Sequence, residues 1–137
     1  LTNDECLKIL SYPVVDYEMS TESMRLFADT PMWNARKNKK MWGMYLKNAT
    51  DKDINIAAPM KNVLPDILPP TYIETTEFDC LRDEGIAYAQ HIRGVAKCVE
   101  LNETKGTIHG YDVLMSHPIT KENLQKRIEF MESHGHV

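Results

Sequence analysis

Three runs of apolar and β-branched residues predict β-strands along the chain. Residues 7–15 are mostly apolar without a clean alternation of apolar and polar positions, as in a strand buried on both faces of a parallel sheet. Pro13 is expected near the end of this strand. Residues 71–78 are β-branched and aromatic and stop before Asp79, and residues 97–103 form the last of the three runs.

Apolar residues at helical spacing follow the first predicted strand. A helix is predicted between Ser20, which suits its N-cap, and Pro31, which ends it. A second helix is predicted over residues 35–48, where the apolar residues form one stripe, namely Met41, Trp42, Tyr45 and Leu46. Such a stripe is ordinarily part of the core, and it is also compatible with the wall of a pocket.

The rest of the chain alternates between irregular and helical patterns. Residues 49–70 hold four prolines and are predicted to form an irregular connection. The run "RDEGIAYAQHIRG" predicts a helix with acidic residues in its first turn, where negative charge suits the helix dipole, and Gly94 at its end. A last helix is predicted from Thr120 to Gly135. Its inward residues are expected to be Leu124, Ile128 and Met131.

The order of these elements predicts the fold class. Strands that alternate with helices form a mostly parallel sheet with flanking helices, joined by right-handed crossovers, which is the α/β class. At 137 residues the chain has the length of a single domain, and its 42% of hydrophobic residues is ordinary for a globular protein.

Charge and composition argue against several kinds of partner. The chain carries 16 Lys and Arg against 20 Asp and Glu, and its main basic run, "RKNKK" at 36–40, is short, so no nucleic-acid partner is expected. A signal peptide and a run of about eighteen apolar residues are both missing from the sequence, which predicts no membrane partner and a cytoplasmic location. Cys6, Cys80 and Cys98 are too scattered for a disulfide framework and fit a reducing compartment.

Two polar residues, Asp79 and His109, follow successive predicted strands. Open parallel sheets bind ligands at the carboxyl ends of their strands, so both side chains are expected at one edge, with Gly106 and Gly110 allowing a tight loop around His109. A carboxylate that accepts the Nδ1 proton of an imidazole leaves Nε2 free to take a proton from a nucleophile. Singly, each residue has an ordinary structural explanation. The pair favours catalysis.

The stretch "PPTYIETTEFDCLRDEGIAYAQHI", followed by "VELNETKGTIHGYD", resembles the carboxyl-terminal part of an α/β-hydrolase of the hormone-sensitive-lipase-like acetyl esterase and carboxylesterase group. In that family the triad acid lies in a D-x-L-x-D-E stretch, matched by Asp79 in "DCLRDE", and the base lies in an I-H-G-F/Y stretch, matched by His109. "YPVVDY" resembles the family's sixth strand, "MWGMYL" its helix beside the acyl pocket, and "AAPMKN" its Ser/Ala-Pro-Leu/Met turn. Cys80 departs from the proline of many relatives, and "RGVAKCVE" differs in spacing.

The resemblance also draws attention to motifs that the sequence lacks. These enzymes carry their nucleophile in G-x-S-x-G and an oxyanion donor in an H-G-G-type loop, both before the acid and the base. Neither motif occurs in the sequence. The resemblance therefore implies that residues 1–137 form the carboxyl-terminal portion of one α/β-hydrolase domain. Its expected parts are a strand at 7–15, a helical pocket region at 20–48, an irregular connection at 49–70 and a strand-helix-strand-helix unit at 71–134.

Other reactive side chains fit a catalytic role less well. Cys80 neighbours the candidate acid in the chain and Cys98 begins a strand, so buried or inert thiols are the better interpretation. His134 and His136 form an H-x-H pair near the end of the chain, but no third ligand is evident, and no metal site is expected.

The function predicted is the hydrolysis of small carboxylic esters through an acyl-enzyme, without a cofactor. Asp79 and His109 would serve as acid and base for a serine outside the chain, and Trp42, Tyr45 and Tyr111 would border the acyl or alcohol pocket. The chain is expected to pair with the missing amino-terminal part or to self-associate. The alternative is a truncated, non-catalytic hydrolase that binds a small ligand or a protein.

Overall fold

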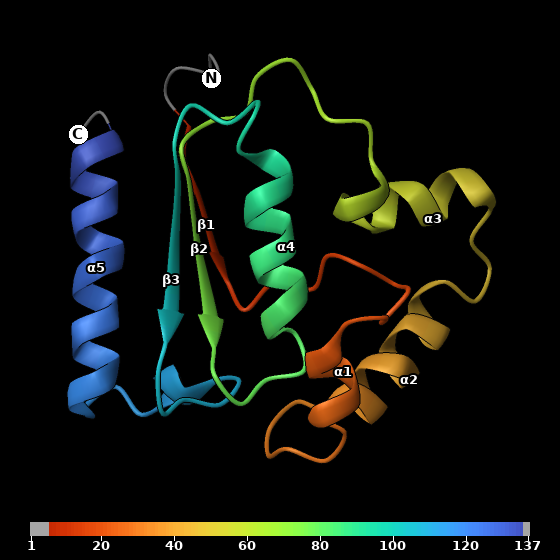
Figure 1. Ribbon diagram of the computed structural model, residues 1–137, viewed down its shortest axis with the longest axis horizontal. Helices are drawn as coiled ribbons and strands as arrows, with labels where there is room; N and C mark the ends of the chain where they lie inside the picture. The colour runs from red at the N-terminus through yellow and green to blue at the C-terminus, as the bar shows by residue number, and fades with distance from the viewer. Residues whose placement is uncertain (1–5, 136–137) are drawn as a thin grey trace.

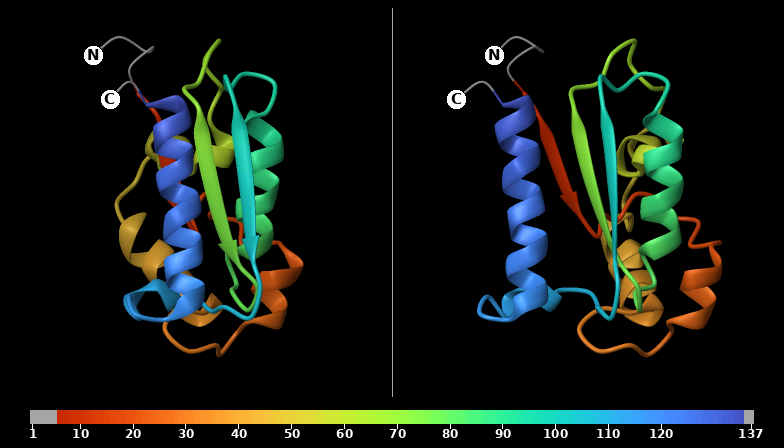
Figure 2. Two further views of the ribbon diagram at one scale, coloured as in Figure 1. Left: turned by 90° about the vertical axis from the view of Figure 1, so that its left-hand side faces the viewer. Right: turned by 60° about the vertical axis from the view of Figure 1, so that its left-hand side comes forward.

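The computed structural model describes residues 6–135, and a parallel sheet stands at the centre of the fold (Figure 1). Within the described residues it has three strands in the order β1-β2-β3. They are β1 (Lys8–Ser11), β2 (Thr71–Thr76) and β3 (Val99–Thr104). Helix α4 (Arg82–Ile92) covers one face of the sheet and α5 (Pro118–His134) the other (Figure 2). The predicted α/β class is confirmed.

The remaining elements lie between β1 and β2 and after β3. They are α1 (Glu22–Leu26), α2 (Ala35–Tyr45), α3 (Asp51–Ala57) and the 3-10 turns η1 (Pro59–Lys61) and η2 (Tyr111–Val113). Helices α1 and α2, together with η2, lie toward the end of the sheet where the strands finish (Figure 1). This arrangement leaves the loops that follow β2 and β3 next to α1 and α2.

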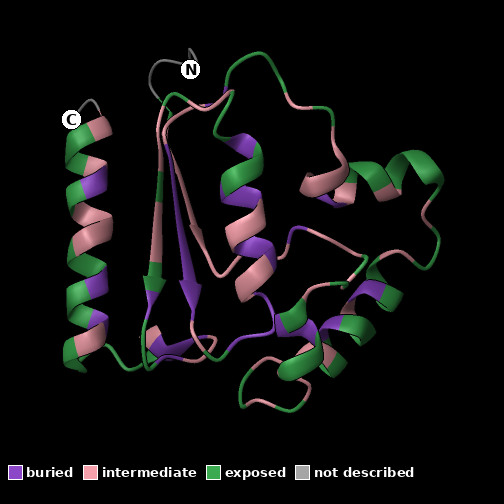
Figure 3. Cartoon of the chain, viewed as in Figure 1, coloured by how far each residue is buried: buried purple, intermediate pink, exposed green. Residues whose placement is uncertain are grey.

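Every residue of β2 is buried (Figure 3). Ile73 pairs in register with Leu10 of β1 and Leu101 of β3, and it packs in the cluster that faces α4. On the other face the ring of Tyr72 lies 5.5 Å from that of Phe130 on α5. Because both faces are covered and both edges are paired, β2 has no solvent-exposed face and its sequence shows no clean alternation.

The first strand is shorter than the predicted span of 7–15. It ends at Ser11 because Tyr12 adopts a left-handed backbone with φ of 38°, which no regular strand contains, and Pro13 follows it. Pro13, expected near the end of the strand, lies just beyond it.

The connection between α2 and β2 is less irregular than the four prolines suggested, and the prediction for 49–70 is wrong over its first part. Helix α3 forms there because Thr50 and Asp53 make a capping box: each side chain accepts a hydrogen bond from the other residue's backbone N–H. The prolines begin only at Pro59, after α3 has ended.

The face that α5 turns to the sheet also differs from the prediction. Leu124 is 37% exposed, whereas Thr120, Asn123 and Phe130 are buried. The helix packs over polar side chains of the sheet, and Asn102 donates a 2.8 Å hydrogen bond to Asn123. In residues 6–135, neither α5 nor any other helix has the length and apolar character needed to cross a membrane.

Two residues at the start of α4 fix how closely this helix approaches its neighbours. A Cβ atom at Gly85 would lie 2.7 Å from Cγ2 of Thr75, so the glycine permits the contact between α4 and β2. Glu84 is buried beside it and accepts a 3.1 Å hydrogen bond from the backbone N–H of Val15, while its Oε2 has no partner. Burial raises the pKa of Glu84 from 4.5 to about 8.

Gly85→Ala should lower the free energy of unfolding by about 1–3 kcal/mol, because the added methyl group forces α4 away from Thr75. Urea titration of the two proteins measures the change. Gly43→Ala in α2 is the matched control, since nothing lies within 4 Å of its added Cβ and alanine favours a helix by about 0.5–1 kcal/mol. Equal effects of the two substitutions would contradict the close approach.

The stability of the chain should depend on Glu84 between pH 4.5 and about 8. In this window the folded chain keeps a proton that the unfolded chain has released, so the free energy of unfolding falls as the pH rises and levels off above about 8. Glu84→Gln should remove this slope, and Glu122→Gln, at an exposed carboxylate on α5, should leave it unchanged. Urea midpoints measured across the pH range test it. A wild-type slope that survives Glu84→Gln refutes the assignment.

Candidate active site

The loops that follow β2 and β3 bring Asp79 and His109 together. His109 Nδ1 lies 2.9 Å from Asp79 Oδ2, which is the distance of a hydrogen bond. The Asp79 side chain is fully buried, whereas that of His109 is 21% exposed. The two residues, called the acid–base pair below, therefore combine a hidden carboxylate with an imidazole that reaches the surface.

The carboxylate of Asp79 is held by three donors. Oδ2 accepts a 2.8 Å hydrogen bond from the hydroxyl of Thr76 in addition to the contact with His109, and Oδ1 accepts one of 3.0 Å from the N–H of Leu81. These bonds offset the cost of burying a carboxylate. They also fix its orientation, because the donors belong to the last residue of β2 and to the turn before α4.

The loop around His109 is closed by backbone and hydroxyl contacts. Gly106 and Gly110 adopt left-handed φ values of 66° and 71°, so glycines stand where the chain turns before and after His109. The hydroxyls of Thr104 and Thr107 share a 2.5 Å hydrogen bond, and the carbonyl of Thr107 accepts one of 2.9 Å from the N–H of Phe78. The loop after β3 is thus tied to the loop after β2.

Two aromatic rings pack on the imidazole of His109, and neither is predicted from the sequence to do so. The ring centroid of Tyr12 lies 4.4 Å from that of His109 at an interplanar angle of 53°, and the ring of Trp33 stacks on His109 at 5.9 Å and 28°. Tyr12 follows β1 and Trp33 precedes α2. Their one signal in the sequence is an aromatic residue beside an expected strand end or helix start.

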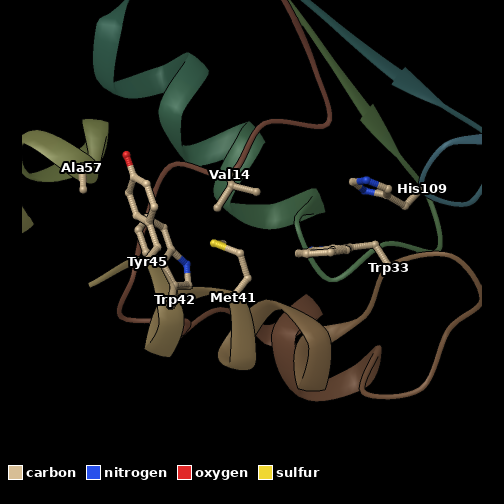
Figure 4. Close-up of a pocket in the computed structure, with 7 residues that line it drawn as sticks. All are labelled: Val14, Trp33, Met41, Trp42, Tyr45, Ala57 and His109. Atoms are coloured by element: carbon tan, nitrogen blue, oxygen red, sulfur yellow. The ribbon is translucent and has the colours of Figure 1, made fainter. Parts of the chain in front are cut away.

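A pocket of about 440 Å³ extends from His109 over α2. Apart from His109 its lining is formed by Val14, Trp33, Met41, Trp42, Tyr45 and Ala57. Figure 4 shows His109 and Trp33 at one end, Trp42, Tyr45 and Ala57 at the other, and Met41 and Val14 between them. A mostly apolar hollow with an imidazole at one end suits the binding of a small, largely apolar molecule.

The predicted pocket residues separate into two places. Trp42 and Tyr45 both line this pocket, as an apolar stripe on α2 allows. Tyr111 does not. Its ring is buried and its hydroxyl donates a 2.7 Å hydrogen bond to Glu74 Oε1, in the interior between the sheet and α5.

Other reactive groups lie apart from this chemistry. Burial raises the pKa of the Cys80 thiol to about 12, so the thiol is protonated at neutral pH. The ring of His134 stacks on Phe130, and its Nδ1 lies 3.1 Å from the Phe130 carbonyl oxygen. His136 lies outside the described residues. Within residues 6–135, no three His, Cys, Asp or Glu side chains are grouped as a metal site requires.

Comparison with known proteins adds independent information. A family model described as an alpha/beta hydrolase fold matches residues 6–113. The carboxylic ester hydrolase LipN of Mycobacterium tuberculosis is 32% identical over 77% of this chain and 28% of its own length. The carboxylesterase NlhH of the same species is 30% identical over 76% of this chain and 34% of its own. The chain thus spans about a third of the length of these curated relatives.

Solved structures show the same likeness. The structure of a bacterial heroin esterase superposes with a TM-score of 0.85 at 31% identity, covering 96% of this chain and 43% of the esterase. The esterase LipW of Mycobacterium marinum gives a TM-score of 0.81 at 27% identity over 92% of this chain and 40% of its own.

Proposed function

This chain belongs to the α/β-hydrolase fold family, in its hormone-sensitive-lipase-like esterase group, and we propose that it supplies the acid and base of a serine carboxylic ester hydrolase. His109 takes the proton of the attacking serine and later donates it to the leaving alcohol, and Asp79 orients the imidazole. The proposal rests on the 2.9 Å contact between His109 Nδ1 and the buried carboxylate of Asp79.

The serine itself comes from outside this chain. No serine in the sequence lies in G-x-S-x-G, and within residues 6–135 no hydroxyl or thiol is hydrogen-bonded to His109. In α/β-hydrolases the nucleophile precedes the acid and the base in chain order. The loop that carries the oxyanion donors also precedes the acid and the base in these enzymes. The chain by itself therefore holds only some of the groups that acyl transfer requires.

The pocket beside His109 suits the acyl or alcohol group of a small ester. Trp42 and Tyr45 border it at the end away from the imidazole, and Met41 and Val14 give it an apolar middle (Figure 4). An apolar group in this pocket would leave the reacting carbonyl near His109, which is the polar residue at the other end. Tyr111 lies outside the pocket and would act through the loop that carries His109.

The free edge of β1 is the surface through which the chain would be completed. Among the described strands β1 pairs only with β2, and its four residues are half-buried, whereas all of β2 is buried. An unpaired row of N–H and C=O groups invites another strand. We assign this edge to the amino-terminal part of an α/β-hydrolase or, without it, to a second copy of the chain.

A chimera tests the catalytic proposal. In the chimera, this chain replaces the part of the bacterial heroin esterase on which it superposes. The chimera should hydrolyse p-nitrophenyl acetate, whereas the isolated chain should hydrolyse it no faster than a histidine-containing control protein does. In the chimera, His109→Ala and Asp79→Asn should each lower kcat by about 10⁴-fold, because the base is lost or left without its orienter.

The matched control for the chimera is His91→Ala, which removes an exposed imidazole from α4 and should leave kcat unchanged. A folded, active chimera whose kcat is indifferent to His109→Ala would exclude His109 as the base. Turnover by the isolated chain that His109→Ala abolishes would reveal a nucleophile within it.

The free edge of β1 predicts association. At low micromolar concentration the isolated chain should sediment as a dimer or larger species, since pairing satisfies the open backbone groups of β1. Ile9→Pro removes an N–H from β1 and is expected to weaken this association, while Val63→Pro, at an exposed loop position, is not. A stable monomer with slow amide exchange across β1 would rule out the missing neighbour.

A further inference from the structure

A cluster of five polar side chains lies behind the His109 loop, and its centre is Arg127 on α5. Arg127 donates to both carboxylate oxygens of Glu74, from Nη2 at 2.7 Å and from Nε at 3.1 Å. It also donates to Asp112 Oδ2, from Nη1 and Nη2 at 3.0 Å each. Tyr111 donates to Glu74 and Tyr12 to Asp112, both at 2.7 Å. These residues are called the Arg127 cluster below.

The Arg127 cluster joins separate parts of the fold in a buried setting. Glu74 lies in β2 and is fully buried, Asp112 lies in η2, and the side chain of Arg127 is 14% exposed. Burial would raise the pKa of Asp112, but the hydrogen bonds from Tyr12 and Arg127 outweigh it and hold this pKa below its usual value. Burial raises the pKa of Tyr12, so its hydroxyl remains a donor at neutral pH.

Tyr12 connects this cluster to the imidazole. Its ring lies 4.4 Å from the ring of His109. Its hydroxyl donates a hydrogen bond to Asp112, which stands three residues after His109 in the same loop. The backbone N–H of Tyr12 donates a 2.7 Å hydrogen bond to the carbonyl of Glu74. The backbone of Tyr12 is therefore fixed to β2, and its hydroxyl is fixed to the loop.

The backbone of Tyr12 is strained at this point. Its φ of 38° is rare for a residue with a side chain, and such a conformation costs on the order of 1–3 kcal/mol. Residues in such conformations persist where their surroundings hold them, and they gather at functional sites. Here the strained turn directs an aromatic ring onto a histidine whose side chain, among residues 6–135, hydrogen-bonds to Asp79.

We propose that Tyr12 is a positioning residue for His109, held in place by Asp112 and Arg127. Its ring restricts rotation of the imidazole, and its hydroxyl anchors the loop, so that Nδ1 stays on Asp79. The name positioning residue rests on the proposed function, in which His109 is the base. The order of the His109 ring, in contrast, is a property of the chain whether or not it catalyses anything.

The test compares single variants of the full chain by NMR with selective labelling of its five histidines, which keeps the spectra readable if the chain self-associates. Tyr12→Phe keeps the ring and buries no unpaired charge, but it removes the hydroxyl that anchors the loop. Exchange of the His109 Nδ1 proton with water should quicken by roughly tenfold or more, because the loop of His109 loses the hydrogen bond from the Tyr12 hydroxyl to the Asp112 carboxylate. Asp112→Asn should act in the same direction.

Tyr72→Phe is the matched control. It deletes a hydroxyl 3.5 Å from Glu74 on the same face of the sheet, and its ring packs on Phe130. His109 exchange should change by less than twofold in this variant. The proposal is overturned if Tyr12→Phe also changes the His109 exchange rate by less than twofold, or if Tyr72→Phe changes it as much as Tyr12→Phe does. It is also overturned if the ring protons of His117 and His134 exchange faster in Tyr12→Phe together with that of His109. An inactive chimera with the expected NMR result would count against the proposed function alone.

Discussion

A carboxylate in the middle of a fully buried strand sets the conditions for much of this fold. Glu74 lies in β2, which has helices over both faces and strands at both edges, so no water reaches its charge. The partner of Glu74 is Arg127, and breaking a buried ion pair by removing one partner costs about 3–5 kcal/mol. An exposed pair such as Arg36 with Asp29 contributes only about 0–1 kcal/mol. Arg127 must therefore stand over β2, and this requirement fixes α5 against the sheet.

Asp79 and His109 are held by different neighbours. On the α4 side, Ser23 of α1 donates to the carbonyl of Cys80 and accepts from the N–H of Asp83, so α1 braces the turn that carries Asp79. On the α5 side, the Arg127 cluster braces the loop that carries His109. The 2.9 Å contact between Asp79 and His109 thus depends on two separate sets of hydrogen bonds that meet at the end of the sheet.

Local sequence patterns contained the information for the acid–base pair but not for its supports. The strands and the residues that follow them were predictable because the ends of neighbouring parallel strands meet at one edge. The partners of Glu74 were not, since Tyr111 and Arg127 stand 37 and 53 residues away from it and meet it only through the register of α5 on the sheet. The sequence suggests Tyr111 for the pocket because it shows an aromatic side chain beside His109. It does not show that the hydroxyl of this side chain bonds to Glu74. Helix α3 is not predicted, because the nearby prolines favour an irregular connection more strongly than its capping box favours a helix.

The supports of the acid–base pair also bear on how a sheet with an open edge can hold it. Asp79 is fixed by Thr76 and Leu81, and the loop of His109 by contacts to the neighbouring loop and to Arg127, none of which involves the open edge of β1. The contact between Asp79 and His109 therefore does not depend on what covers that edge. Tyr12 is different, because it directly follows β1 and also touches the imidazole. Any shift of β1 on pairing at its free edge would reach His109 through this ring, which links the edge of the sheet to the geometry of the imidazole.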